Sequence, residues 1–144
     1  MMKKSFWAVI ISIVFALILG TSGAFATESA MSKEIEKALE EVEKTNSKIF
    51  EEIDKTQQKS YELYDKYQKD LSKETDAEKQ THIKNKYEEK ITDLISKLDV
   101  KTQDITRKGV RKAEKAGLKV EIYLVEVEFA DRSAWIDPIR VFGW

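Results

Sequence analysis

His82 is the only histidine in the chain, and the sequence contains no cysteine. Zinc clusters of histidine and cysteine, Cys–His nucleophiles and paired-histidine metal motifs are therefore excluded. A Ser-His-Asp triad stays open by composition, but no serine stands in a Gly-x-Ser-x-Gly elbow. His82 also follows Glu78 by four residues, the spacing of a solvated side-chain pair on a helix. We expect no catalytic residue, no metal and no cofactor.

A cluster of cations could bind a polyanion, such as an anionic wall polymer or lipid headgroups. Its members are Arg107, Lys108, Arg111, Lys112 and Lys115. A second interpretation is structural: cations near the C-terminus of a helix are favourable with its dipole, and an acidic neighbouring helix would neutralise them. The structural interpretation is favoured.

Aromatic residues gather in two places. Tyr61, Tyr64 and Tyr67 recur every three residues, which suits either a stacking ladder for sugar rings or, preferably, a packed helical stripe. The last ten residues hold Trp135, Phe142 and Trp144 within a dense apolar cluster. Trp135 and Phe142 either cover the helix ends or contact a partner, whereas Trp144, as the last residue, is harder to bury and is the better candidate for partner contact.

Residues 1–26 have the pattern of an export signal. Lys3 and Lys4 precede an uncharged apolar run over residues 6–19, and Ala24-Phe25-Ala26 matches a small-x-small cleavage site. We expect cleavage near Ala26 and a secreted or extracytoplasmic protein of the cell envelope; the alternative is an uncleaved N-terminal membrane anchor. Removing the two lysines leaves 23 basic and 26 acidic residues, a modest net charge of −3 that does not call for a nucleic-acid partner.

Residues 27–108 contain neither glycine nor proline and consist mainly of residues that favour helices. Apolar residues recur at alternating spacings of three and four, which predicts a helix with one buried stripe. Asn46, Thr56 and Ser60 interrupt this stripe. An inward polar residue can determine register or oligomeric state at a cost in stability.

The fold class predicted for the chain is mainly α: a long antiparallel, coiled-coil-like helical hairpin over residues 27–116, followed by a small β-hairpin and apolar tail over residues 117–144. The predicted helices run from Ser29 to Ser72 and from Asp76 to Ala116, with the turn near residues 72–75. Thr75 and Glu78 suggest a capping box, and Gly117 a helix stop. A kink near Asp99, giving three shorter helices, is the competing arrangement.

Charge supports the hairpin, because folding the chain back places the acidic residues 28–55 beside the basic residues 106–119. Two helices alone have little interior, so self-association or a C-terminal cap should supply the rest. A dimer contact is expected around Tyr61, Tyr64, Leu71 and Tyr87.

After Gly117 the apolar period changes to two, which predicts a strand. The apolar phase reverses near Leu124, as a bulge or twist would cause. Residues 130–133 are expected to turn the chain, and residues 134–142 to return as a strand interrupted or left at an edge by Pro138.

These patterns favour an exported, non-enzymatic interaction or structural protein, in which the hairpin is a spacer or oligomerisation element and the Trp-rich tail docks on a partner. That partner would be a second copy or another envelope protein, and a small-molecule substrate is not expected. The first alternative is a cell-envelope polyanion binder, and the second a small secreted hydrolase with a pocket around His82.

Overall fold

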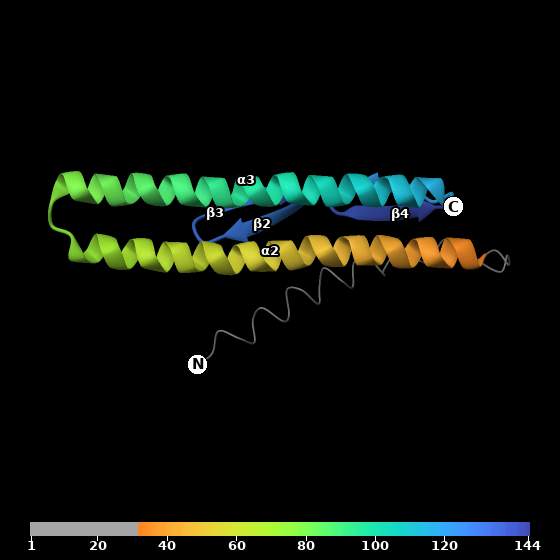
Figure 1. Cartoon of the computed structure of the whole chain (residues 1–144), viewed down its shortest axis with the longest axis horizontal. Helices are drawn as coiled ribbons and strands as arrows, with labels where there is room; N and C mark the ends of the chain where they lie inside the picture. The colour runs from red at the N-terminus through yellow and green to blue at the C-terminus, as the bar shows by residue number, and fades with distance from the viewer. Residues whose placement is uncertain (1–31) are drawn as a thin grey trace, which may run out of the picture. The chain divides into compact units, whose positions relative to one another are not determined.

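The computed structural model describes residues 32–144, and Lys33–Trp144 forms one compact unit (Figure 1). The predicted export signal, its cleavage site and the alternative membrane anchor all lie outside the described residues. The unit contains two long helices followed by four short strands. No helix in residues 32–144 is long and apolar enough to cross a membrane.

The helical hairpin is confirmed, with α2 at Lys33–Lys73 and α3 at Ala77–Lys115 lying antiparallel (Figure 1). The predicted start of α2 at Ser29 lies outside the described residues. The alternative of a kink near Asp99 is wrong, because α3 continues through this residue as one helix. Residues 77–108 of α3 contain neither glycine nor proline, so the sequence around Asp99 gives no reason for a kink.

Both ends of α3 have defined caps. The predicted capping box at Thr75 is wrong by one residue: Asp76 is the N-cap, and its carboxylate accepts a hydrogen bond from the Lys79 amide at 3.0 Å. At the other end the prediction for Gly117 is confirmed, since this glycine has a φ of +91°. The amides of Gly117 and Leu118 donate to the carbonyls of Glu114 and Ala113, which is a Schellman arrangement.

The β-hairpin is also confirmed, as four short strands that form two antiparallel pairs. β1 (Lys119–Ile122) pairs with β4 (Ile139–Gly143), and β2 (Val125–Phe129) pairs with β3 (Arg132–Ile136). The predicted phase reversal falls in the gap between β1 and β2, and the predicted interruption at Pro138 separates β3 from β4. We call residues 119–143 the ribbon.

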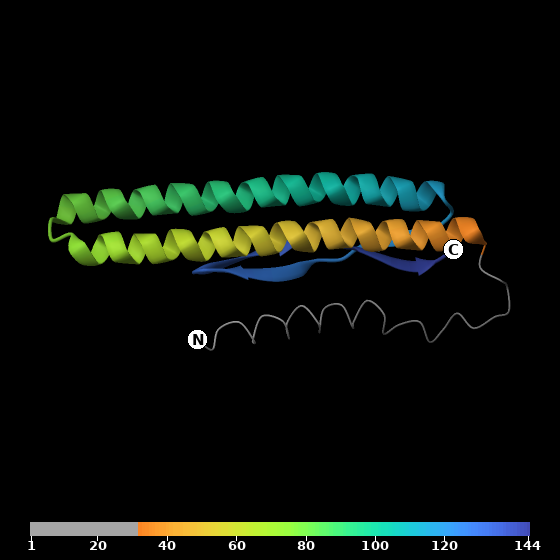
Figure 2. The same cartoon turned by 60° about the horizontal axis from the view of Figure 1, so that its bottom comes forward.

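The ribbon lies along one side of the helix pair and covers the part of both helices that is distant from their connecting turn (Figures 1 and 2). Side chains from both helices and the ribbon form two buried apolar clusters. One contains Ile49, Ile53, Leu98, Val127, Phe129 and Ile136. The other contains Ala38, Val42, Ala113, Leu118 and Ile139. The ribbon therefore supplies the cap that two helices alone require.

Polar side chains within the buried stripe hold the ribbon backbone. Asn46 donates to the Ile139 carbonyl at 2.8 Å and accepts from the Ile139 amide at 2.9 Å. Thr106 donates to the Asp137 carbonyl at 2.6 Å. The inward polar residues Asn46 and Ser60 were expected to determine register or oligomeric state, but in the described chain both bind ribbon backbone. A buried amide or carbonyl without a partner is costly, which explains polar residues at these positions.

The helices and ribbon approach closely at Gly109. A Cβ atom there would lie 2.5 Å from Cγ2 of Thr45 on α2 and 2.7 Å from Cδ1 of Ile139 on β4. Neither distance is compatible with van der Waals contact, so the absence of a side chain allows three elements to meet.

The predicted pairing of acidic and basic helix segments is confirmed by an ion pair between α2 and α3, in which Lys112 lies 3.5 Å from Glu41. A second ion pair, with Lys101 2.7 Å from Glu52, joins the helices outside the predicted basic segment. The hydrogen bond from Lys101 is the largest cause that lowers the pKa of Glu52. The lysines of these pairs are solvent-exposed, so the pairs contribute little to the stability of the fold. Their main effect is to favour this alignment of the two helices over others.

Candidate interaction surface

The strand alternation gives the ribbon an inner face toward the helices and an outer face toward solvent. Val127 and Ile136 point inward and are buried, whereas their neighbours Glu126 and Trp135 point outward and are exposed. We define the outer face by its side chains, which are partly apolar and partly charged. They are Lys119, Glu121, Leu124, Glu126, Glu128, Ser133, Trp135, Arg140 and Phe142.

Large apolar side chains are exposed mainly on the ribbon. Seven large hydrophobic residues of the described chain are exposed, and five of them lie in residues 122–144: Ile122, Leu124, Trp135, Phe142 and Trp144. The other two are Tyr61 and Val100 on the helices. Exposed apolar residues that gather in one place often mark an interaction site.

The structure places all three predicted partner contacts in solvent, with Trp135 at 58%, Phe142 at 50% and Trp144 at 51% exposure. Covering the helix ends was the alternative role for Trp135 and Phe142, but Leu118 and Ile139 are the buried residues at that end. Sequence reasoning did not select Ile122 and Leu124 as exposed. The phase reversal near Leu124 was the available signal, because a reversal leaves one apolar residue on the wrong face.

Charged groups on the outer face are unevenly paired. Nε of Arg140 donates to Glu121 at 2.8 Å, and the guanidinium lies 5.8 Å from the centre of the Tyr123 ring. Burial raises the pKa of Tyr123. Within residues 32–144, Glu128 and Lys119 have no ion-pair partner.

The turn of the ribbon is fixed to both helices. Arg132 donates two hydrogen bonds to Glu88 of α3, at 3.1 and 3.3 Å, and its guanidinium lies over the Tyr87 ring. On the α2 side, Ser60 accepts from the Ala130 amide at 3.1 Å. The outer face is therefore presented on a ribbon that is anchored at its turn.

Tyr87, one of the four residues around which a dimer contact is expected, is buried within the chain, and the dimer contact itself stays a prediction. Its ring stacks on Tyr67 with centres 4.5 Å apart and meets Tyr64 edge-on. Burial is the main cause that raises the pKa of Tyr87, and the nearby Asp131 carboxylate raises it further, although no hydrogen bond of acceptable geometry joins them. The packed-stripe interpretation of the tyrosines fits this arrangement better than a sugar-stacking ladder does.

The predicted cation cluster is partly neutralised by neighbours. Lys108 pairs with Asp104 at 2.6 Å, and Lys112 pairs with Glu41 at 3.5 Å. The hydrogen bond from Lys108 lowers the pKa of Asp104. Arg107, Arg111 and Lys115 are exposed and have no ion pair in the described part of the chain.

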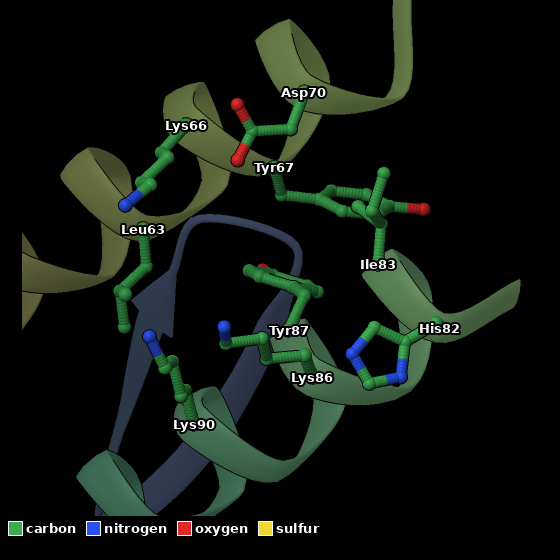
Figure 3. Close-up of a pocket in the computed structure, with 9 residues that line it drawn as sticks. All are labelled: Leu63, Lys66, Tyr67, Asp70, His82, Ile83, Lys86, Tyr87 and Lys90. Carbon is green, nitrogen blue, oxygen red and sulfur yellow. The ribbon is translucent and has the colours of Figure 1, made fainter. Parts of the chain in front are cut away.

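His82 lies on the exposed surface of α3, where it lines a shallow hollow near the helical turn (Figure 3). The lining is mainly cationic and aromatic: Leu63, Lys66, Tyr67, Asp70, Ile83, Lys86, Tyr87 and Lys90 join the histidine. No serine lines the hollow, and the side chain of His82 makes no hydrogen bond with another residue of the described chain. Residues 32–144 also bring no three potential ligands among His, Cys, Asp and Glu together as a metal site.

A buried carboxyl group that sequence reasoning did not identify lies at the interruption of the ribbon. Oδ1 of Asp137 is buried without a hydrogen-bond partner, and burial raises the pKa of this carboxyl. Its neighbour Pro138 is fully buried.

Comparison with known proteins adds no assignment, because no protein-family model, curated protein or solved structure matches this chain.

Proposed function

We propose that this chain is an exported, non-enzymatic interaction protein that docks through the outer face of its ribbon. The observation that carries the proposal is the gathering of exposed large apolar residues on the ribbon, including Trp135 and Phe142. Tryptophan and phenylalanine contribute large contact areas, and tryptophan is enriched among the residues that dominate binding energies.

The helical hairpin would serve as a rigid spacer that supports the outer face of the ribbon. Its two helices are continuous, and the ribbon is bound to both of them through Asn46, Ser60 and Arg132. A docking face on a supported ribbon loses less conformational entropy on binding than one on a free tail.

The test uses a photo-activatable cross-linking amino acid, introduced singly at Trp135, Phe142 or Val100 in cells that produce the protein. Val100 is the matched control, since it is 65% exposed but lies on α3. We expect a discrete cross-linked species from positions 135 and 142 and none from position 100. Equal cross-linking from all three positions, or none from the ribbon, would contradict the proposal.

Binding of an anionic envelope polymer or lipid headgroups is the second candidate function. It is favoured by the three exposed cations Arg107, Arg111 and Lys115, which have no ion pair in residues 32–144. Such binding would depend on salt, because the contacts are solvent-exposed.

This candidate is tested by retention of residues 27–144 on a sulfated polysaccharide column and by binding to vesicles that contain anionic phospholipid. The double variant Arg107→Glu/Arg111→Glu should elute at lower salt than Lys79→Glu/Lys84→Glu, a control that makes the same change in net charge at the opposite end of α3. Equal elution of both variants would exclude the cluster as the binding site.

A further inference from the structure

We propose that the occupant of the outer face is a second copy of this chain, docked face to face and antiparallel about a two-fold axis. This inference rests on the proposed function, because it names the partner of the same face. A two-fold contact requires a surface that is complementary to itself after the ribbon direction is reversed. The distribution of charge along the outer face meets this requirement.

The register of the strands orders the outer side chains from the turn to the free ends. Glu128 comes first, opposite Ser133, and Glu126 follows opposite Trp135. Leu124 lies near the middle of the ribbon, in the gap between the β1–β4 pair and the β2–β3 pair. Beyond it come Glu121 opposite Arg140, then Phe142 and Lys119. The half of the outer face near the turn is therefore acidic, with Glu126 and Glu128. The two cations of the outer face, Lys119 and Arg140, both lie in the other half.

Reversal of one ribbon over another brings unlike groups together. Glu128 of one copy then meets Lys119 of the second copy, and this contact occurs twice by symmetry. Trp135 of one copy meets the half of the second copy's outer face that carries Arg140. Leu124 of one copy meets Leu124 of the second copy near the two-fold axis. Glu128 and Lys119 have no ion-pair partner within residues 32–144, so this arrangement supplies one to each of them.

The charge pattern favours a second copy over an anionic membrane as the occupant. Three glutamates, Glu121, Glu126 and Glu128, lie on the same face as Trp135. Carboxylates repel anionic headgroups, whereas amphipathic helices that bind the membrane interface carry cations beside their aromatic residues. Unlike charges at opposite ends of one face fit its own reversed copy.

The size of the face indicates a weak, concentration-dependent dimer. A ribbon of this length extends about 35 Å and is about 10 Å wide, from the ordinary rise per residue and strand spacing. The contact area would be about 350 Å² per copy before the aromatic side chains are added, below the ~800 Å² per partner of a standard interface. Contacts below the standard size are typical of weak, transient complexes, so we expect dimerisation to depend strongly on protein concentration.

The test is sedimentation velocity of residues 27–144 over a concentration range from micromolar to millimolar. This segment contains the compact unit Lys33–Trp144 together with both of its buried clusters, so it includes everything that folds in the described chain. Glu128→Lys and Lys119→Glu should each weaken dimerisation by at least about tenfold, because each places like charges at both symmetric contacts. The double variant should restore the dimer, since it only exchanges the two signs.

Glu62→Lys is the matched control, because it makes the same change in charge at an exposed position on α2 and should leave dimerisation unaltered. Circular dichroism of each variant checks that the fold is intact. A chain that stays monomeric at every concentration overturns the second copy as occupant, while cross-linking of Trp135 to another protein would still support the docking function. A dimer that neither charge reversal weakens overturns the antiparallel arrangement.

Discussion

Asn46 shows how one side chain can join two elements. Its amide group both donates to and accepts from the backbone of Ile139, as a neighbouring strand would, although Asn46 lies on a helix. The residue is only 4% exposed, so water cannot replace these two bonds. Each backbone group left unpaired in such a site costs roughly 1–3 kcal/mol.

Asn46→Ala should therefore lower the free energy of unfolding by about 2–6 kcal/mol, because it leaves both the amide and the carbonyl of Ile139 buried without a partner. Chemical denaturation followed by circular dichroism measures the change. Asn85→Ala is the control at an exposed helical position and should change the value by less than about 0.5 kcal/mol. Equal effects from both variants would show that the Asn46 bonds do not hold the ribbon.

Asp137 is a second residue whose behaviour follows from its surroundings. Burial raises the pKa of its carboxyl above the ordinary 3.8, so the folded chain binds the proton more tightly than the unfolded chain does. The stability that this carboxyl contributes is fully present below pH 3.8 and is lost as the pH rises through the raised pKa. At neutral pH its charge destabilises the fold.

Asp137→Asn should increase the free energy of unfolding at pH 7, and the increase should shrink as the pH falls toward 3.8. Urea denaturation at a series of pH values gives the difference between the variant and the original chain. Asp65→Asn removes an exposed carboxylate of α2 and should change stability by less than about 0.5 kcal/mol. A destabilised Asp137→Asn at pH 7 would mean that the charged form is favoured in the fold.

At the scale of elements, the ribbon divides the helical hairpin into a covered and an uncovered part (Figure 1). Buried residues of both helices lie under the ribbon, among them Ile49 and Ile53 of α2 and Leu98 of α3. No residue from Tyr61 to Lys86 is buried, although α2 and α3 extend through this segment. Local stability follows buried apolar contact, so the two parts should open with different free energies.

Hydrogen–deuterium exchange should show slow exchange in the covered parts of α2 and α3, and exchange faster by at least about tenfold in residues 61–86. Peptide-resolved mass spectrometry provides the measurement. Each helix serves as its own control, because both contain a covered and an uncovered part in one continuous element. Uniform protection along both helices would show that the ribbon adds no local stability.

At the scale of the whole molecule, the proposed role depends on export, which was inferred from residues 1–26 alone. Those residues combine Lys3 and Lys4, an apolar run and the site Ala24-Phe25-Ala26. The compact unit begins at Lys33, so cleavage near Ala26 would remove none of its elements.

Intact mass measurement of the protein from its producing cells should give a chain that starts near Thr27. Ala26→Asp should block this processing, because signal cleavage needs a small uncharged residue directly before the cut. Ala30→Asp is the control, since it lies beyond the predicted site and should leave the mass of the removed segment unchanged. An intact chain that begins at Met1 inside the cell would contradict export.

The sequence by itself determined the helical hairpin, the stop at Gly117, the phase reversal and the interruption at Pro138. Each of these follows from local properties: helix propensity over a segment without glycine or proline, a glycine that tolerates positive φ, and a proline that cannot donate to a strand. The N-cap at Asp76 was missed by one residue, because Thr75 and Asp76 are both good caps and only the backbone geometry selects between them.

Only the tertiary structure decided which faces are covered. Alternation along the strands defines two faces, but it does not say which face meets the helices, so the outward position of Trp135 could not be predicted. The inward polar residues on α2 likewise could not be assigned, because their partners are backbone groups of the ribbon 70 or more residues away. Contacts at such separation depend on packing of complete elements, which no local pattern of residue types encodes.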